Sequence, residues 1–210
     1  MRRGVRLALE QLAPYLLAVS DPPVPLEFEA VFGNANPVEL EIGFGKGLFL
    51  LNSAASRPDH NFLGVEIERK YQLFTANRIA KRGLPNVRLA CADARAFLRD
   101  YIPSDSVQAI HVYFPDPWWK QRHKKRRLWT PDFATQCARV LRPGGRLHAA
   151  TDVEEYFRVI AVHLANQGRL RPLPPPAERT PGHDFDFLTN FERKWRQAGK
   201  VVYRSLHEKE

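Results

Sequence analysis

The chain has 210 residues, which is room for one ordinary domain, and its 44% of apolar residues argue for a packed core and against global disorder. Its 32 lysines and arginines exceed its 23 aspartates and glutamates, giving a formal charge of +9, and a basic domain of this kind often binds a polyanion. Two cysteines without a Cys-x-x-Cys pair exclude a disulfide framework and a cysteine zinc knuckle. The histidines show no metal-ligand spacing, so no metal is predicted, and a reducing cytoplasm fits best.

The first twenty residues imitate an export signal only faintly, because four residues interrupt the apolar stretch: Arg6, Glu10, Gln11 and Pro14. We therefore expect an amphipathic helix over residues 5–19 and a proline-rich arm over residues 20–35. No later stretch approaches the roughly 18 apolar residues that a membrane span needs. The predicted organisation is an N-terminal helix and arm over residues 1–35 and one domain over residues 36–210.

From Val38 onward, short apolar runs alternate with longer helical patterns, and this order predicts a parallel sheet covered by helices on both faces. The expected strands are 38–42, 61–66, 87–91, 107–114, 146–150 and 201–206. The expected helices are 46–55, 69–82, 94–100, 131–141 and 153–166. A proline cluster over residues 172–176 predicts a surface loop.

A glycine-rich turn joins the first of these strands to its helix. Gly43, Gly45 and Gly47 form a G-x-G-x-G pattern, whereas the dinucleotide fingerprint G-x-G-x-x-G would need glycine where Leu48 stands. The observed spacing is the one associated with S-adenosylmethionine (AdoMet) sites. We favour a ligand site over a turn whose glycines only permit packing.

The next two strands each deliver an acid at their carboxyl ends, where ligands of open parallel sheets bind. Glu66 closes the second strand, where a carboxylate could accept both hydroxyls of a ribose, and Asp93 follows the third, where an acid could receive the amino group of an adenine. Glu41 lies before the glycines and could face a ligand's ammonium group or brace the loop. A single such acid would be read as a solvated strand end. The three acids and the glycine turn together predict a nucleoside-bearing cofactor.

The fourth strand ends in FPDPWW, where two prolines restrict the backbone on either side of Asp116. Trp118 and Trp119 add flat aromatic surface, so the turn suits a planar base that stacks on one side and forms hydrogen bonds on the other. The alternative is a structural turn with tryptophans in the core, and we do not expect both rings to touch substrate.

A cationic run follows at once over residues 120–127, where six of eight side chains are lysine or arginine. Such a run can be a solvated loop or a nuclear-import signal. Its position four residues after Asp116 favours a third reading, in which the run holds a phosphate backbone while a base enters the pocket. Asp152, after the fifth strand, is expected at the same edge, with Thr151 as a helix cap.

Together these residues resemble the bacterial tRNA (guanine-N7-)-methyltransferases, and the match covers most of the chain. The segments that carry it are VELEIGFGKG, FLGVEIE, ACADA, VYFPDPWWKQRHKKRRL, ATDVEEYF and LTNFERKWRQAGKVVYRSLHEK. The FPDPW-x-K-x-RH-x-KRR block is highly specific, whereas the glycine turn alone is not. The resemblance implies an α/β, Rossmann-like class I AdoMet-dependent methyltransferase. Its mostly parallel sheet would have seven strands, with an antiparallel last strand and helices on both faces.

The resemblance also implies roles for individual residues. AdoMet would be contacted by four acids: Glu41, Glu66, Asp93 and Asp116. The tRNA substrate would be held by six residues: Lys120, Asp152, Thr189, Asn190, Phe191 and Glu192. The RNA would run along six more: Arg122, His123, Lys124, Lys125, Arg126 and Arg127. Trp119 departs from the family, whose members often carry proline or histidine there, and we take this position as variable. Monomer and homodimer both stay open.

The implied product is 7-methylguanosine in tRNA, at position 46 of the variable loop. Guanine N7 carries a free lone pair at neutral pH, so no proton has to be removed before it attacks the methyl group. The enzyme then needs alignment and an acid that tolerates a cationic product, and we assign that catalytic role to Asp116. This chemistry agrees with the lack of any Ser-His-Asp or Cys-His set.

Two other classes stay open on the residues alone. The first is an AdoMet enzyme that methylates an exocyclic amine of DNA or RNA, although such enzymes typically follow the acid with two prolines and Asp116 is followed by one. The second is a non-catalytic RNA-binding protein with a relic cofactor fold. Glu66 and Asp93 argue against it, because a relic need not keep them.

Overall fold

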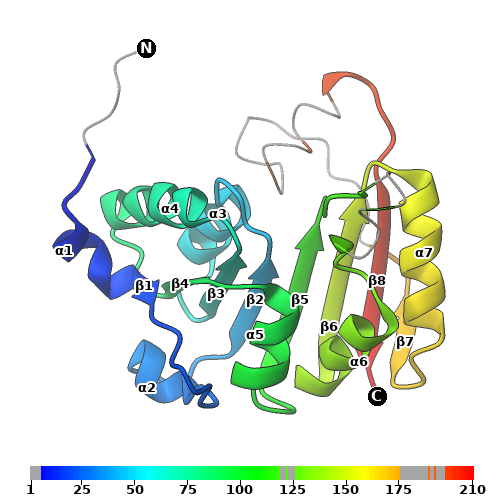
Figure 1. Ribbon diagram of the computed structural model, residues 1–210, viewed down its shortest axis with the longest axis horizontal. Coiled ribbons are helices and arrows are strands. Elements are labelled where there is room, and N and C mark those ends of the chain that lie inside the picture. The colour runs from blue at the N-terminus through cyan, green and yellow to red at the C-terminus, as the bar shows by residue number, and fades with distance from the viewer. Residues whose placement is uncertain (1–5, 119–121, 123–125, 176–188, 190–191, 193–196) are drawn as a thin grey trace.

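The computed structural model describes residues 6–118, 122, 126–175, 189, 192 and 197–210. The described strands form one sheet in the order β1-β4-β3-β2-β5-β6-β8-β7 (Figure 1). They are β1 (Leu16–Leu17), β2 (Val38–Ile42), β3 (Asn61–Glu66), β4 (Val87–Cys91), β5 (Val107–Tyr113), β6 (Leu141–Thr151), β7 (Leu170–Leu173) and β8 (Tyr203–Lys209). Strands β1 to β6 pair in parallel, and β8 is antiparallel to both neighbours. The predicted α/β class and mostly parallel sheet are confirmed.

Residues at the helix ends determine where several of the helices begin and end. They are α1 (Leu9–Leu12), α2 (Phe28–Phe32), α3 (Leu48–Ser56), α4 (Arg69–Arg82), α5 (Ala94–Tyr101), α6 (Pro131–Val140) and α7 (Glu154–Ala165). Thr130 caps α6 by accepting the Phe133 N–H at 3.1 Å. Gly83, with φ 59°, ends α4 in the left-handed conformation that glycine adopts without strain. None of the described helices combines the length and apolar character that crossing a membrane requires.

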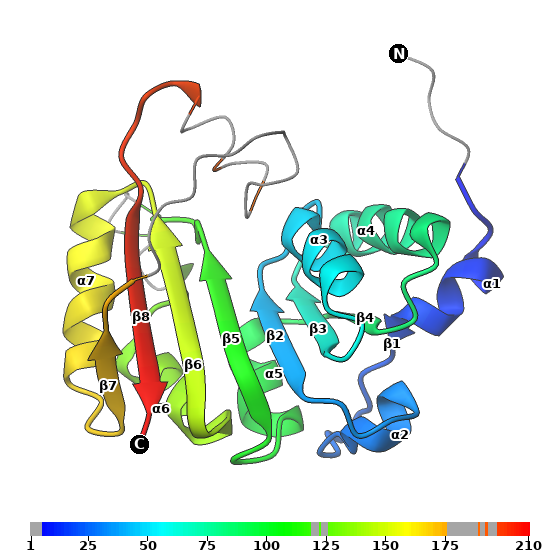
Figure 2. The same ribbon diagram turned by 180° about the vertical axis from the view of Figure 1, so that it is seen from behind.

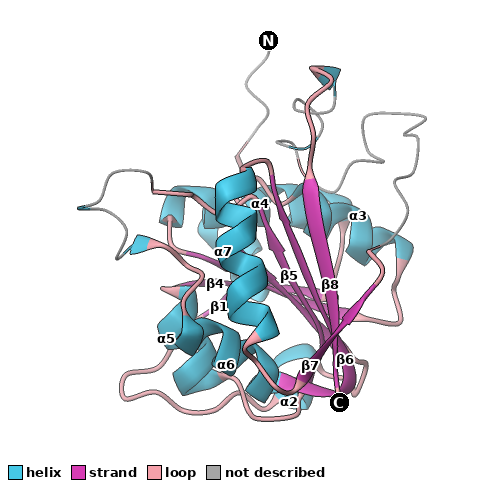
Figure 3. Ribbon diagram, turned by 90° about the vertical axis from the view of Figure 1, so that its right-hand side faces the viewer, coloured by secondary structure: helices cyan, strands magenta, loops and turns pink. Residues whose placement is uncertain are grey.

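Helices cover both faces of the sheet and build two apolar cores. The core beneath α5, α6 and α7 includes Leu40, Ile110 and Phe133, all fully buried. The core beneath α1, α3 and α4 includes Leu50 and Phe62. Figure 2 shows α3 in front of the sheet with α5 and α6 behind it, and Figure 3 shows the same separation from the side. The five residues of β2 are all buried, as expected of a central strand with both faces covered.

The two ends of the described chain depart from the predicted elements. The helix expected over residues 5–19 is reduced to α1, a 3₁₀ turn over Ala13–Tyr15 and the short strand β1, because Pro14 has no N–H to continue an α-helix. The described residues form eight strands, one more than the seven that the resemblance implies and two more than the six expected from the residue pattern, which did not predict the edge strands β1 and β7. Pro172 is tolerated in β7 because an edge strand can do without one N–H.

Candidate active site

Two adjoining cavities lie at the carboxyl ends of β2, β3, β4 and β5. The larger cavity, about 880 Å³, is lined by acids from three strand ends: Glu66, Asp93 and Asp116. The smaller cavity, about 390 Å³, is lined by Glu41, Gly45, Lys46 and Thr189 among others. Four residues line both: Gly43, Tyr71, Tyr113 and Phe114. The sheet therefore brings the predicted cofactor acids to one continuous site.

The glycine turn combines ligand approach with close packing. Gly43 and Gly45 line the smaller cavity and have φ of 73° and 50°, a region in which other residues are strained. Gly47 does not line either cavity. A Cβ on Gly47 would lie 2.2 Å from the Thr75 side chain, so this glycine allows the turn to pack on α4. Two of the three predicted glycines therefore face the site, and the third serves packing.

Glu66 and Asp93 are both held by hydrogen bonds at the rim of the larger cavity. Glu66 accepts the N–H of Gly45 on one oxygen at 3.0 Å and the N–H of Glu68 on the other at 3.1 Å. Asp93 caps α5 by accepting the Arg95 N–H at 2.9 Å and pairs with the Arg95 guanidinium at 2.7 Å. The hydrogen bond from the Arg95 side chain is the main reason that the pKa of Asp93 lies below its usual range. Asp93 is therefore a carboxylate where it lines the larger cavity.

Glu41 is the most deeply buried acid of the site. Only 3% of the residue is exposed, and the Leu50 N–H donates a hydrogen bond to its carboxyl group. Its Oε2 has no hydrogen-bond partner among the described residues. Burial, and next the negative charge of Glu66, raise the pKa of Glu41 well above its usual range. A buried carboxyl group that lines a cavity and has one oxygen without a hydrogen-bond partner suits a cationic group of a ligand.

The backbone of the turn that carries Asp116 is strained, and a hydrogen bond to β6 holds it in place. Phe114 and Trp118 bracket it with φ of 52° and 44°, a left-handed conformation that costs a residue other than glycine on the order of 1–3 kcal/mol. The Phe114 N–H donates to the Ala150 carbonyl at 2.8 Å. Asp116 is exposed at the wall of the larger cavity, and the Trp118 side chain lies on the same wall. Strain that is held in place at a cavity is typical of a functional turn.

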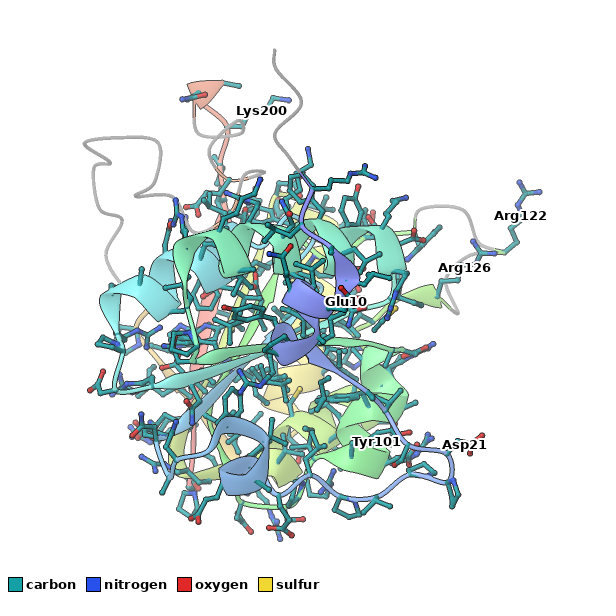
Figure 4. The ribbon with its side chains drawn as sticks, turned by 90° about the vertical axis from the view of Figure 1, so that its left-hand side faces the viewer. Glu10, Asp21, Tyr101, Arg122, Arg126 and Lys200 are labelled. Atoms are coloured by element: carbon teal, nitrogen blue, oxygen red, sulfur yellow. The ribbon has the colours of Figure 1, made fainter. Side chains whose placement is uncertain are left out.

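The structure describes three residues of the cationic run, and these three lie in different surroundings. Arg122 and Arg126 are exposed. Figure 4 shows Arg122 reaching away from the body of the molecule, whereas Arg126 also lines the larger cavity. The Arg126 guanidinium lies 5.1 Å from the centroid of the Trp118 ring. Arg127 is only 9% exposed, donates to the Pro117 carbonyl at 2.7 Å, and lies over the Tyr156 ring. Arg127 therefore packs against the turn that carries Asp116, and its predicted contact with RNA stays a prediction.

The remaining predicted contacts lie in different surroundings. Thr189 lines the smaller cavity and accepts the Glu192 N–H at 3.0 Å, as a helix cap would. Glu192 is 2% exposed and paired with Arg204 of β8, so its carboxylate braces the sheet. Asp152 is half-buried and lines neither cavity. Six predicted contacts lie outside the described residues: Lys120, His123, Lys124, Lys125, Asn190 and Phe191.

A line of buried polar side chains beneath Tyr113 was not among the features predicted from the sequence. The Tyr113 hydroxyl lies 2.9 Å from Nδ1 of His111, and Nε2 of His111 lies 2.9 Å from Glu39, which pairs with Arg57. Burial lowers the pKa of His111. Burial favours a raised pKa for Glu39, but His111 and Arg57 outweigh it and lower the pKa to about 2. A neutral His111 thus donates to Glu39 and accepts from Tyr113, which fixes this wall of both cavities.

A signal for this line was present in the strand pattern. Glu39 and Glu41 alternate along β2, and His111 and Tyr113 alternate along β5, so all four side chains lie on one face of the sheet. Polar residues at alternate positions of otherwise apolar central strands indicate a buried network. The described residues hold no group of three or more His, Cys, Asp or Glu side chains arranged for a metal ion.

Comparisons with solved structures show the fold. The chain resembles the aminoglycoside resistance methyltransferase NpmB1 with a TM-score of 0.64 and 19% identity, over 92% of this chain and 95% of that one. It resembles the 16S rRNA methyltransferase KamB with a TM-score of 0.62 and 20% identity, over the same shares of the two chains. Both likenesses support the class I methyltransferase fold.

Comparisons of sequence show the family. Residues 35–205 match the family described as "Putative methyltransferase". The chain is 41% identical to the tRNA (guanine-N(7)-)-methyltransferase of Rhodopirellula baltica, over 94% of this chain and 75% of that protein. It is 35% identical to the enzyme of that name in Yersinia enterocolitica, over 100% and 87%, and 35% identical to that of Geobacter metallireducens, over 93% and 92%. The chain therefore belongs to the tRNA (guanine-N(7)-)-methyltransferase family.

Proposed function

We propose that this protein transfers the methyl group of AdoMet to N7 of a guanine in tRNA, giving 7-methylguanosine. The family to which the chain belongs indicates which reaction it catalyses. The observation that supports it in this chain is the pair of adjoining cavities that share four lining residues, since Glu66, Asp93 and Asp116 line one and Glu41 lines the other. The target at position 46 of the variable loop, inferred from the resemblance, stays a prediction.

The residues present fit AdoMet at both of its ends. Glu66 would accept the ribose hydroxyls and Asp93 the adenine amino group in the larger cavity. Glu41 would face the ammonium group in the smaller cavity, because its Oε2 has no hydrogen-bond partner among the described residues. The glycine turn lets the ligand lie against the backbone between them. When bound, AdoMet supplies a methyl group activated by its sulfonium charge.

Asp116 and Trp118 are proposed to receive the guanine. The lone pair of N7 attacks the methyl carbon, the carbon–sulfur bond breaks with its electrons returning to sulfur, and the positive charge moves to the purine. No proton is removed in this step, so the protein needs no general base. The carboxylate of Asp116 would align the base and stabilise the developing charge, with the Trp118 ring as a stacking surface. The strained turn and the Arg127 bond to Pro117 would hold both in position.

The reaction is tested by incubating the protein with unmodified tRNA and methyl-labelled AdoMet and analysing the nucleosides by mass spectrometry. The expected result is label in 7-methylguanosine alone. Label in an N2-methylguanosine or N6-methyladenosine would replace this proposal with exocyclic-amine methylation. Binding of tRNA without any label transfer would indicate a non-catalytic RNA-binding protein.

A further inference from the structure

Helix α4 carries a second group of basic residues, separate in sequence from the cationic run over residues 120–127. Five of its 14 residues are cationic and none is acidic: Arg69, Lys70, Arg78, Lys81 and Arg82. Between Glu68 and Asp93 the sequence contains no acid at all. A helix face that is only solvated commonly mixes both signs, because opposite charges four residues apart attract. Lys70 pairs with Glu68, just before the helix, at 3.1 Å, but α4 itself carries charges of a single sign, and this calls for another explanation.

The charges on α4 are crowded enough to oppose one another. Arg78 and Arg82 stand four residues apart, a spacing at which like charges destabilise a helix. Burial, and next the repulsion of Arg82, lower the pKa of Arg78. A polyanion bound along this helix would relieve that repulsion, whereas solvent only screens it.

An aromatic ring lies among these cations. Phe74 is 49% exposed, and the Arg78 guanidinium lies 5.9 Å from its ring centroid. Arg78 also donates to the carbonyl of Lys46 in the glycine turn. The helical period places Lys70, Phe74, Arg78 and Lys81 along one side of α4. Cations that alternate with an exposed ring match the requirements of a nucleic acid, whose phosphates pair with the cations while a base stacks on the ring.

This basic side of α4 is continuous with the active site. Tyr71, in the first turn of α4, lines both cavities, and the exposed Lys46 lines the smaller one. Arg126 lines the larger cavity from a different segment. The N-terminal segment adjoins the same helix, because the Leu7 N–H donates to Oδ1 of Asn77 at 2.9 Å. A long polyanion with one nucleotide in the site would have cations on both sides of its path.

We propose that α4 and Lys46 form a second tRNA-binding surface, which contacts the phosphate backbone away from the nucleotide that enters the cavities. We call it the α4 surface, and it consists of Lys46, Lys70, Phe74, Arg78, Lys81 and Arg82. The proposal rests on the proposed function, because it takes tRNA as the polyanion. The cations contact phosphates, and Phe74 stacks on an unpaired base.

The test compares tRNA affinity over a range of salt concentrations for Lys81→Ala/Arg82→Ala, Phe74→Ala and the wild type. Each lost phosphate contact should make the slope of log affinity against log salt shallower by about one. Phe74→Ala should weaken binding on the order of tenfold at every salt concentration and leave the slope unchanged. In steady-state methylation, the double variant should raise the KM for tRNA and leave kcat near wild type.

The matched control is Arg142→Ala/Arg169→Ala, which removes two exposed cations at the opposite end of the strands. A salt slope in the α4 double variant equal to that of this control would overturn the proposal and leave α4 as a solvated face. A Phe74→Ala variant that binds tRNA as the wild type does would overturn the stacking contact. If the wild type forms no 7-methylguanosine, the proposed function fails, whereas an active wild type with an insensitive α4 surface overturns only this inference.

Discussion

The backbone N–H of Gly45 donates a hydrogen bond to Oε2 of Glu66 at 3.0 Å, and this bond ties the glycine turn to the end of β3. The second oxygen of Glu66 accepts the Glu68 N–H at 3.1 Å. Each carboxylate oxygen therefore orients backbone on one side of the larger cavity. The acid that we assign to the ribose is also the brace of the turn that the cofactor approaches.

Replacing Glu66 should accordingly affect binding and local structure together. Glu66→Ala removes charge-assisted hydrogen bonds to the ligand, a loss of about 1.5–3 kcal/mol in AdoMet affinity by calorimetry. It also leaves two backbone N–H groups without their acceptor, so a modest fall in melting temperature is expected. Asp59→Ala, an exposed acid at the other end of β3, is the control and should retain affinity. Unchanged AdoMet affinity in Glu66→Ala would remove this residue from the site.

Asp116→Asn should slow the transfer step while leaving tRNA affinity nearly intact. The amide keeps the shape and hydrogen-bonding capacity of the side chain and removes its charge. Loss of one preorganised electrostatic contact typically costs on the order of 10²–10³ in rate, although a conservative amide retains part of it. The measurement is single-turnover methylation with saturating tRNA and AdoMet. A wild-type rate in this variant would show that the carboxylate charge of Asp116 takes no part in the transfer step and that the proline turn has only a structural role.

Arg126 and Arg127 are neighbours in sequence and should give opposite results when replaced singly. Arg126→Ala removes an exposed cation and should weaken tRNA binding, with a shallower salt slope and an unchanged melting temperature. Arg127→Ala frees the Pro117 carbonyl and removes the contact with the Tyr156 ring, so we expect a loss of about 1–3 kcal/mol in stability. Thermal unfolding and filter binding on both variants decide the assignment. If both variants lost tRNA affinity to the same extent and had the same stability, Arg127 would be a contact to RNA, as Arg126 is.

Glu41→Gln should stabilise the ligand-free protein at neutral pH. The pKa of Glu41 is raised in the folded state, so the folded protein holds this proton more tightly than the unfolded chain does. The resulting stability is complete below the unfolded pKa and is lost as the pH rises toward the folded pKa. Glutamine carries no charge at any pH, so its advantage in melting temperature should be present at pH 7 and vanish toward pH 4. An advantage that stays constant over this range would show that Glu41 does not titrate there.

The same carboxyl group should couple AdoMet binding to the release of a proton. The ligand's ammonium group favours the carboxylate form of Glu41, and the displaced proton passes to the buffer. The proton is counted by calorimetry near pH 7 in two buffers of different ionisation enthalpy, because the observed binding enthalpy then differs between the buffers in proportion to the protons released. Methylthioadenosine lacks the amino-acid part and should bind without proton release. Equal proton release with both ligands, or in Glu41→Gln, would contradict the assignment.

The sequence predicted the alternation of strands and helices well, because the central strands are apolar runs and the helices carry their own start and stop residues. Gly83 and Thr130 are examples in which a single residue determines a helix end. The rule that ligands bind at the carboxyl ends of parallel strands also predicted one shared edge for Glu66, Asp93 and Asp116, and all three line the larger cavity. These features depend on local pattern and on one topological rule.

The features that the sequence did not reveal depend on tertiary contacts. Arg127 stands in a run of identical charges, and only the fold shows that its side chain turns inward to Pro117. Glu192 likewise meets Arg204 from a strand that follows it in sequence. Glycine spacing could not separate the packing role of Gly47 from the ligand-facing Gly43, because that distinction depends on Thr75 in a different helix.

The position of β8 between β6 and β7 has a consequence for synthesis on the ribosome. Strand β7 pairs only with β8 among the described strands, so it has no place in the sheet until residues 203–209 have emerged. Until then β6 lacks its partner on that side, although the strands whose ends line the two cavities are already complete. Arrival of β8 also brings the Lys209 ammonium group to the Leu141 carbonyl at 2.6 Å and to Asp105 at 2.7 Å. A nascent chain that stalls before residue 203 would therefore leave one edge of β6 and the strand β7 unpaired among the described strands, and exposed strand edges favour aggregation.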